Sequence, residues 1–328
     1  MTLPTVLVTG GAGYIGSHVC RALSQAGFQP IIYDDLSQGH RFLVKHGPLE
    51  VGDIRDRNRL DEVLGQSKPV ACIHLAGLIA VGESVAFPEQ YADVNIGGTA
   101  ILLSALREAG VFAVVMSSSC AVYGEPQTEL LDEHHPLNPA SPYGRNKLSM
   151  EQLLQDCGHW GLRHVALRYF NAAGADAAGD IGEAHEPETH LIPLLLEVAA
   201  GKRDVFKIFG TDYPNPDGTA IRDFIHVTDL ADAHVRAVKL LLDGHPGLPI
   251  NLGSGKGVSV REMIAACAEV TGATLNVAEA ERREGDPARL VAVGNRARDV
   301  LGWNPMHSDL RTILQDAWRW HIDGEKYR

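Results

Sequence analysis

Short apolar runs alternate with longer segments of helical period through the first half of the chain. The runs that we expect to form strands are Thr5–Val8, Pro30–Tyr33, Leu49–Val51, Val70–Leu75, Phe112–Met116 and His164–Tyr169. Four of these runs are nearly unbroken in apolar residues, as is typical of parallel strands buried on both faces. The segments that we expect to form helices are Ile15–Ala26, Asn58–Gly65, Thr99–Ala109 and Pro142–Cys157. This alternation predicts an α/β fold with a doubly wound parallel sheet of the Rossmann type.

Glycines follow three of the predicted helices, at Gly27, Gly110 and Gly158. A glycine in this place often adopts the left-handed conformation that ends a helix. We therefore expect each of the three to be such a terminator.

The alternation stops after Asn171. Residues 172–190 are rich in glycine, alanine and acids with little periodicity, which indicates a long functional loop at a domain boundary. We expect one domain over residues 1–172 and a second, smaller α/β domain over 173–328, with a return of the chain to the first around 218–250. The elements expected in the second half are a helix Leu191–Ala200, a strand near Lys207–Phe209, a helix Asp229–Leu242 capped by Thr228, and a helix from Val260 with a Ser259/Glu262 capping box.

Composition excludes several classes of partner. With 328 residues the chain exceeds the usual size of a single core, and a net charge of −12 argues against binding to nucleic acid or to an anionic membrane. No apolar run approaches the roughly 20 residues of a membrane span. Five scattered cysteines without a CxxC pair favour reduced thiols, and so a cytoplasmic protein.

A glycine-rich turn carries the first candidate chemistry. Gly11-x-Gly13-x-x-Gly16 follows an apolar strand and opens an amphipathic helix, the setting in which a backbone turn and a helix N-terminus bind a pyrophosphate. Asp34 follows 18 residues later, where a carboxylate accepts hydrogen bonds from ribose hydroxyls, and Asp35 beside it favours NAD over NADP. The alternative is a turn that only packs a helix on a sheet. Asp53, before Ile54, is either an adenine contact or a turn residue.

Tyr143 and Lys147 carry the second candidate chemistry. Ser141 and Pro142 predict a helix start, which places Tyr143 and Lys147 one turn apart on the same face. The ammonium and the helix dipole are expected to lower the phenol pKa, so that the phenolate can take a proton from a sugar hydroxyl. Ser119, at the end of the fifth predicted strand, would bond the same oxygen. A surface Tyr–Lys pair is the alternative, and the position after a nucleotide-binding fold argues against it.

Nine stretches, in this order, resemble motifs of the extended short-chain dehydrogenase/reductase family, in particular of its UDP-sugar 4-epimerases. They are Thr9–His18, Leu75–Gly77, Ala80–Ser84, Ser117–Gly124, Ser141–Gly144, Leu167–Asn171, Gly210–Pro214, Ile221–Val227 and Arg282–Asp286. The resemblance implies an isomerase with tightly bound NAD that reversibly epimerises C4 of a UDP-hexose, such as UDP-glucose or UDP-galactose, through a 4-keto intermediate. Tyr143, Lys147 and Ser119 would be catalytic.

The resemblance also implies the binding residues of both domains. NAD contacts are expected at Gly10, Gly13, Tyr14, Ile15, Gly16, Asp34, Asp35, Asp53, Ile54, Leu75, Ala76, Ser117, Tyr143, Lys147 and Tyr169. Substrate contacts are expected at Ser119, Tyr143, Phe170, Asn171, His190, Leu191, Phe209, Arg222, Arg283, Asp286 and Leu290. The arginines would hold the diphosphate, Asp286 the ribose hydroxyls, and Leu191 and Phe209 the uridine. The family further suggests a homodimer.

Other functions remain open at this point. A 4-epimerase of a UDP-pentose, a UDP-uronic acid or a UDP-N-acetylhexosamine differs mainly in the sugar pocket, where the intermediate size of Leu290 motivates acceptance of an N-acetyl group as a hypothesis. A non-catalytic NAD-binding regulator would not need Tyr143 and Lys147 together. Ser119-Cys120-Ala121 lacks the acid–base residues expected of a 4,6-dehydratase.

Histidines and acids outside these motifs do not predict a metal site. His134, His135, His185 and His190 form no HxxxH or HExxH pair on a predicted helix, so we expect no metal. The acid-rich segment Asp176–Glu188 is expected to be a solvated loop over the substrate.

Overall fold

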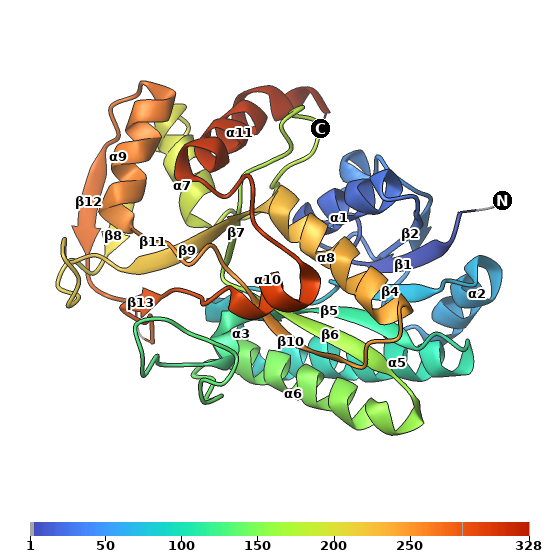
Figure 1. Cartoon of the computed structure of the whole chain (residues 1–328). Helices are drawn as coiled ribbons and strands as arrows, with labels where there is room; N and C mark the ends of the chain where they lie inside the picture. The colour runs from blue at the N-terminus through green and yellow to red at the C-terminus, as the bar shows by residue number, and fades with distance from the viewer. Residues whose placement is uncertain (1–2, 284, 328) are drawn as a thin grey trace.

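Seven parallel strands form the central sheet of the computed structural model, which describes residues 3–283 and 285–327. Their order across the sheet is β10-β6-β5-β4-β1-β2-β3 (Figure 1). The strands are β1 (Thr5–Thr9), β2 (Gln29–Asp34), β3 (Leu49–Val51), β4 (Ala71–His74), β5 (Ala113–Ser119), β6 (Arg163–Tyr169) and β10 (Gly247–Leu252). Strand order reverses beside β1, so the doubly wound parallel sheet is confirmed.

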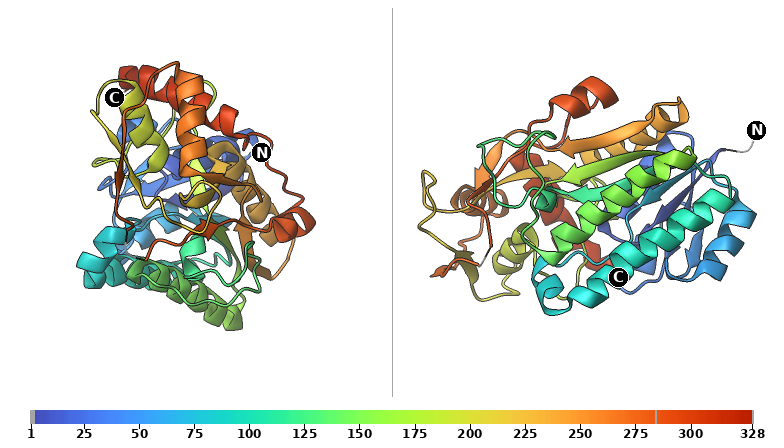
Figure 2. Two further views of the ribbon diagram at one scale, coloured as in Figure 1. Left: turned by 90° about the vertical axis from the view of Figure 1, so that its left-hand side faces the viewer. Right: turned by 90° about the horizontal axis from the view of Figure 1, so that it is seen from below.

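Each face of this sheet carries its own layer of helices. Along β1, Val6 and Val8 pack toward one face and Leu7 toward the other, because successive side chains in a strand alternate. The first face is covered by α1 (Tyr14–Gln25), α8 (Val227–Leu242) and α10 (Asn295–Leu301). The second is covered by α2 (Arg57–Ser67), α5 (Gly98–Glu108) and α6 (Pro142–Asp156), which lie in front in the view from below (Figure 2). Strands buried on both sides explain the nearly unbroken apolar runs.

Two of the three predicted helix-ending glycines are confirmed. Gly27 and Gly110 have φ angles of 85° and 75°, in the left-handed region. The prediction for Gly158 is wrong, because α6 continues into a 3-10 turn, η4 (Cys157–Trp160), and the left-handed residue is Gly161 at φ 90°.

Of the two helix N-terminal caps predicted in the second half of the chain, one is confirmed and one is wrong. The Ser259/Glu262 capping box at the start of α9 (Val260–Thr271) is confirmed. Thr228 is not the cap of α8, because the helix begins at Val227 and its N-cap residue is His226. The His226 ring accepts the Thr228 backbone N–H at 3.1 Å in its place.

The second lobe is built on smaller sheets and three helices. Strand β9 (Ile221–His226) pairs with three short strands, β7 (Asn171–Ala173), β11 (Gly257–Ser259) and β13 (Arg289–Leu290). A separate pair joins β8 (Phe206–Phe209) to β12 (Val277–Ala280). Helices α7 (Leu191–Ala199), α9 and α11 (Leu310–Asp323) enclose a core that includes Leu195, Met263 and Leu314.

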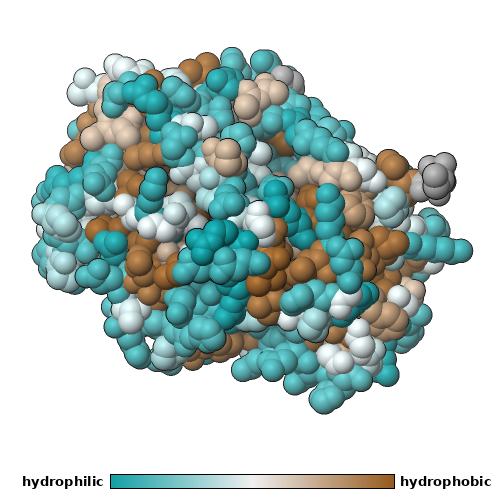
Figure 3. Space-filling model, viewed as in Figure 1, coloured by the Kyte–Doolittle hydropathy of each residue, from teal (hydrophilic) through white to brown (hydrophobic). Residues whose placement is uncertain are grey.

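The chain returns to the central sheet directly after β9. Helix α8 packs on its first face, and β10 extends the sheet by pairing with β6 up to Leu252 opposite Tyr169. The division at residues 172 and 173 stays a prediction. Within the described residues, no helix combines the length and the apolar character that crossing a membrane requires. The surface in Figure 3 is mostly polar, with apolar residues gathered toward its middle.

The remaining segments of the described chain are short helices and turns. They are α3 (Val81–Ala86), α4 (Pro88–Tyr91), the π-helical turn η2 (Ala92–Gly97), and the 3-10 turns η1 (Arg41–Leu43), η3 (Cys120–Val122) and η5 (Gly324–Tyr327).

Candidate active site

The glycine-rich turn joins β1 to α1, and its glycines have different structural roles. Gly10 has φ 71°, and a Cβ there would lie 2.7 Å from the Ala76 nitrogen, so this position needs glycine for both conformation and space. At Gly16 a Cβ would come 2.1 Å from the Gly10 oxygen, which shows how closely α1 approaches the turn. At Gly13 a Cβ would meet only the Gly10 oxygen, at 3.4 Å, so the chain itself leaves room there. That room lies at the N-terminus of α1, where a pyrophosphate fits.

Asp34 ends β2 and fastens the glycine-rich turn. Its two carboxylate oxygens accept the backbone N–H groups of Ala12 and Leu36, each at 2.9 Å. Burial raises the Asp34 pKa, and these two hydrogen bonds act in the opposite direction. Asp35 points elsewhere and accepts from Ser37 at the surface. Asp34 thus fixes the turn, while its predicted ribose contact stays a prediction.

Asp53 lies two residues beyond the end of β3 and is ion-paired. Its carboxylate accepts from the Arg55 guanidinium at 2.6 Å, and hydrogen bonding to Arg55 lowers the Asp53 pKa. Ile54 beside it is buried. Leu75 and Ala76 follow β4 directly, and the Leu75 N–H donates to the Thr9 carbonyl at 3.0 Å. These four residues lie beyond the carboxyl ends of their strands, where such sheets bind ligands.

Tyr143 lies on the first turn of α6, next to Ser119 at the end of β5. Ser141 caps this helix by accepting the Gly144 N–H at 3.1 Å, as predicted. The Tyr143 N–H donates to the Ser84 hydroxyl at 3.2 Å. The Ser119 side chain lies near the Tyr143 hydroxyl and lowers its pKa, so two of the three predicted catalytic residues lie together.

The predicted lowering of the Tyr143 pKa is wrong for the protein alone. Burial raises the pKa of Tyr143 to about 12, and the Ser119 hydrogen bond offsets only part of this effect. Burial also lowers the pKa of Lys147 to about 8, since the ammonium is almost fully enclosed. Desolvation outweighs the attraction between the two groups, because the ammonium lies 5.8 Å from the centre of the phenol ring.

Lys147 donates mainly to Ser117. Its ammonium lies 2.8 Å from the Ser117 carbonyl oxygen and 3.2 Å from the hydroxyl. Tyr169, on the next strand, is buried with its hydroxyl bonded to the His234 ring of α8. In the β5–β6 register Tyr169 stands opposite Ser119, and the other predicted NAD contact, Ser117, lies two residues earlier on β5.

A cavity of about 550 Å³ opens in the second lobe. Its lining includes four of the predicted substrate residues: Leu191, Phe209, Arg283 and Asp286. The Arg283 guanidinium stacks over the Phe209 ring at 4.0 Å, so an aromatic face and a cation lie together. Glu284, between these residues in the sequence motif, lies outside the described residues.

Arg222, Leu290 and Phe170 lie between this cavity and Ser119. Arg222 of β9 is ion-paired with Asp286 and stands opposite Leu290 in the β9–β13 register. Leu290 packs on the same small cluster as Phe170 and Cys120, next to Ser119. Asn171 donates its side-chain amide to the Asp223 carbonyl at 3.0 Å. The predicted substrate residues thus form a path from the cavity to Tyr143.

His190 is not part of that lining. Its Nδ1 lies 2.8 Å from Glu183 Oε1, so the ring turns toward the loop that precedes α7. Conversely, the cavity is lined by Arg203 and Lys207, which sequence reasoning missed. Two basic residues within five positions beside a predicted strand were the available signal.

Comparisons with known proteins agree with this geometry. Residues 6–253 match the model of the "NAD dependent epimerase/dehydratase family". The chain is 56% identical to the UDP-glucose 4-epimerase of Rhizobium meliloti (strain 1021), over 96% of each protein. The UDP-glucose 4-epimerase of Brucella ovis, solved with NAD, superposes with a TM-score of 0.94 at 48% identity, covering 96% of this chain and 97% of that one.

A second solved structure carries a sugar nucleotide. The UDP-glucose-4-epimerase of Stenotrophomonas maltophila, with bound NAD and formylated UDP-arabinopyranose, superposes with a TM-score of 0.95 at 40% identity. This match covers 99% of this chain and 100% of that one. From the glycine-rich turn, the Tyr143–Ser119 pair and these full-length matches, we conclude that the chain belongs to the NAD-dependent epimerase/dehydratase family.

Proposed function

We propose that this protein is a UDP-glucose 4-epimerase, which interconverts UDP-glucose and UDP-galactose with NAD. The observation that carries the proposal is the placement of Ser119 beside Tyr143 at the carboxyl end of β5, with Lys147 one turn along α6. Bound NAD supplies a reversible acceptor for the hydride at C4 of the sugar.

The glycine-rich turn fits the dinucleotide. Gly13 leaves the backbone accessible at the start of α1, with Tyr14 and Ile15 in its first turn, while Gly10 supplies the left-handed turn and Gly16 keeps the helix close. Asp34 and Asp35 would take the adenosine ribose, and Asp53 and Ile54 the adenine. Leu75, Ala76, Ser117, Lys147 and Tyr169 would complete the NAD site.

Tyr143 is the proposed acid and base. Its oxygen takes the proton from the sugar 4-hydroxyl as C4 loses a hydride, and returns it when the hydride comes back to the other face. Ser119, which lies near the phenol, would donate a hydrogen bond to the same sugar oxygen. Because burial disfavours the phenolate, the positive charges of Lys147 and of oxidised nicotinamide are needed to stabilise it.

The cavity of the second lobe would hold the uridine diphosphate. Leu191 and Phe209 offer apolar contact to the base, and Arg283 offers forked donors to the phosphates. Arg222, which is ion-paired with the lining residue Asp286, offers a second set of forked donors. Arg222 would exchange its ion pair with Asp286 for phosphate oxygens, which frees Asp286 for the ribose hydroxyls. Tight binding of the nucleotide leaves the hexose free to rotate. The hexose would lie between Asn171, Phe170 and Leu290.

Several finer points belong to the same proposal. A UDP-N-acetylhexosamine is a second candidate substrate, favoured by the aliphatic Leu290 near the sugar end. The homodimer implied by the family and a cytoplasmic location, in keeping with the five free cysteines, are also proposed.

Incubation with UDP-galactose tests the proposal. We expect UDP-glucose to form without added cofactor, and protein reduced by sugar to show the absorbance of bound NADH. Unchanged UDP-galactose with NAD still bound would instead favour a non-catalytic NAD-binding regulator. Conversion only of a UDP-pentose or UDP-uronic acid would move the assignment to that substrate.

A further inference from the structure

Four side chains of one short segment converge just before α7. They are Glu183, His185, Glu188 and His190, and one potential ligand atom from each lies within 4.8 Å of all the others. All four come from the loop between β7 and α7, residues 174–190, which we call the bridging loop.

The closest separations are those of hydrogen-bonded ion pairs, and they are shorter than the separations in a four-coordinate metal site. Glu183 Oε1 lies 3.1 Å from His185 Nδ1 and 2.8 Å from His190 Nδ1. His190 Nδ1 lies 3.3 Å from Glu188 Oε1. Zinc bound to imidazole nitrogen and carboxylate oxygen at about 2.0–2.2 Å in a tetrahedron holds its ligands about 3.4 Å apart. Small rotations of these side chains would admit an ion at their centre.

Burial and charge point in the same direction. The Glu183 and Glu188 side chains are only 9% and 10% exposed, whereas His190 is 48% exposed, so two largely buried carboxylates share a cluster that opens to water at His190. Ionised groups removed from water need an opposite charge nearby. In the described contacts the groups that counter the charge of Glu183 are the two imidazoles. A divalent cation would balance both carboxylates and leave the imidazoles neutral, as metal ligands are.

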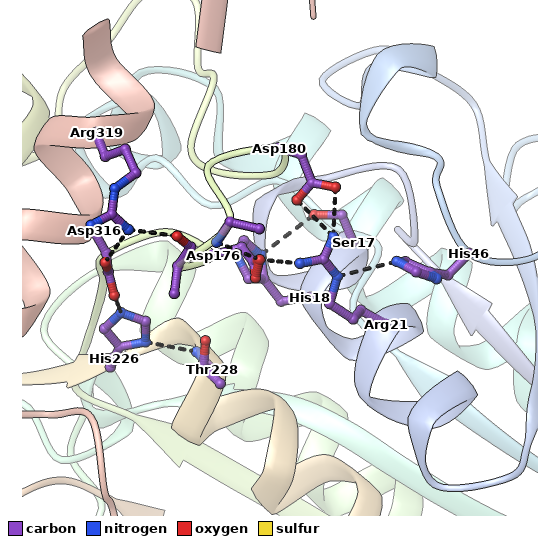
Figure 4. Close-up of polar contacts among 12 residues, drawn as sticks. Ser17, His18, Arg21, His46, Asp176, Asp180, His226, Thr228, Asp316 and Arg319 are labelled. Carbon is purple, nitrogen blue, oxygen red and sulfur yellow. Dashed lines mark hydrogen bonds and ion pairs between the residues drawn. The ribbon is translucent and has the colours of Figure 1, made fainter. Parts of the chain in front are cut away.

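The bridging loop is anchored to both lobes at other points. Arg21 of α1 forms ion pairs with Asp176 and Asp180, and Arg319 of α11 donates to the Ala177 carbonyl (Figure 4). Closer to the cluster, the Glu183 carbonyl accepts from the Trp320 indole at 2.7 Å and the Ala184 carbonyl accepts from the His40 ring at 2.6 Å. The cluster therefore lies where one loop connects the two lobes.

We propose that Glu183, His185, Glu188 and His190 bind one divalent transition-metal ion, of the zinc class, that clamps the bridging loop. Two imidazoles favour such an ion over magnesium or calcium, which prefer ligand sets made of oxygen. Four protein ligands close the coordination shell, so the ion is structural rather than catalytic. The clamp sets the start of α7, whose Leu191 lines the nucleotide cavity, but it does not depend on the reaction proposed above. It departs from the sequence-based expectation of no metal.

Metal content and affinity of the intact, NAD-bound protein test the proposal. After chelation and dialysis, zinc is titrated against a chromophoric competitor, and we expect one ion per chain. His185→Gln and Glu183→Gln should each weaken zinc binding by at least about tenfold, since each removes one ligand. The matched control is His159→Gln, which changes an exposed histidine outside the cluster and should leave the affinity unchanged. Zinc should also raise the Tm of the wild type and not that of His185→Gln.

Equal zinc affinity in the wild type and in a folded His185→Gln variant would overturn the proposal, and so would the absence of stoichiometric binding. If the variants do not fold, cobalt(II) in the wild-type protein decides the question. Intense visible bands of four-coordinate cobalt would support the site, and the weak bands of a six-coordinate ion would refute it.

Discussion

Lys147 lies closer to Ser117 than to the phenol it was expected to activate. Its ammonium is 2.8 Å from the Ser117 carbonyl oxygen and 5.8 Å from the centre of the Tyr143 ring. The lysine is thus held by the end of β5, and its charge acts on Tyr143 from a fixed point. This arrangement makes the proton chemistry sensitive to both groups.

The pH dependence of kcat/KM should reflect the opposite shifts of these two groups. Activity needs Tyr143 deprotonated and Lys147 protonated, and burial puts their pKa values at about 12 and about 8. The product of the two required fractions rises with pH up to the lower pKa and is level between the two. We expect log kcat/KM to rise with pH and to level off at or below about pH 8, since oxidised NAD adds positive charge that moves the limb downward. A profile that falls steadily between about pH 6 and 8 would contradict this account.

The buried ion pair of Arg168 and Glu151 should be important for stability. Arg168 Nη2 lies 2.6 Å from Glu151 Oε2, and their side chains are 2% and 10% exposed. Ser118 and Tyr123 also bond to this pair. Glu151→Leu should lower the free energy of unfolding by about 3–5 kcal/mol, because it leaves a buried guanidinium without its partner.

The control for that variant is an exposed pair on α8. Asp232→Ala breaks the pair of Asp232 with Arg236, whose side chains are 48% and 41% exposed, and should cost less than about 1 kcal/mol. Both values come from urea unfolding with NAD content held equal. Similar losses of unfolding free energy in the two variants would show that the buried Arg168–Glu151 pair contributes no more to stability than the exposed pair.

Arg222→Met should raise KM for UDP-galactose by about tenfold to a hundredfold, through loss of a charge-assisted contact to the diphosphate. Bound NAD should be unchanged, because Arg222 belongs to β9. Arg282→Met is the matched control, since Arg282 pairs with exposed Asp212 and does not line the cavity. If both variants changed KM equally, Arg222 would not be a diphosphate ligand.

Leu290→Tyr should lower the turnover of UDP-N-acetylglucosamine relative to UDP-glucose. Leu290 packs beside Phe170 and Cys120, so a larger ring there reduces the space for a sugar substituent. The measurement is the ratio of the two rates in the variant and in the wild type. An unchanged ratio would exclude Leu290 as the gate.

Much of the fold could be predicted because its signals are local. The strand β1 and the helix α1 follow from an apolar run and from the glycine turn between them. The prediction that Gly158 ends its helix failed because a 3-10 turn can continue a helix past its first glycine, and this depends on packing rather than on composition. The cap of α8 was missed because a histidine ring replaced the usual hydroxyl.

The site likewise has a part that could be predicted from the sequence and a part that could not. The residues up to Tyr169 follow from motif and strand position, whereas Arg203 and Lys207 line the cavity through the fold of the second lobe, for which the sequence offers no motif. The direction of the Tyr143 pKa shift depends on burial, and spacing along a helix does not report burial. The convergence of Glu183 and His190 likewise depends on the path of a loop without periodicity.

The Tyr143→Phe variant tests the central claim most directly. With NAD content confirmed in both proteins, the rate of UDP-galactose conversion is compared with that of the wild type. The account predicts a loss of about 10²–10⁴-fold in kcat with NAD retained, as for removal of a general acid–base group. A variant that converts UDP-galactose at the wild-type rate would contradict it.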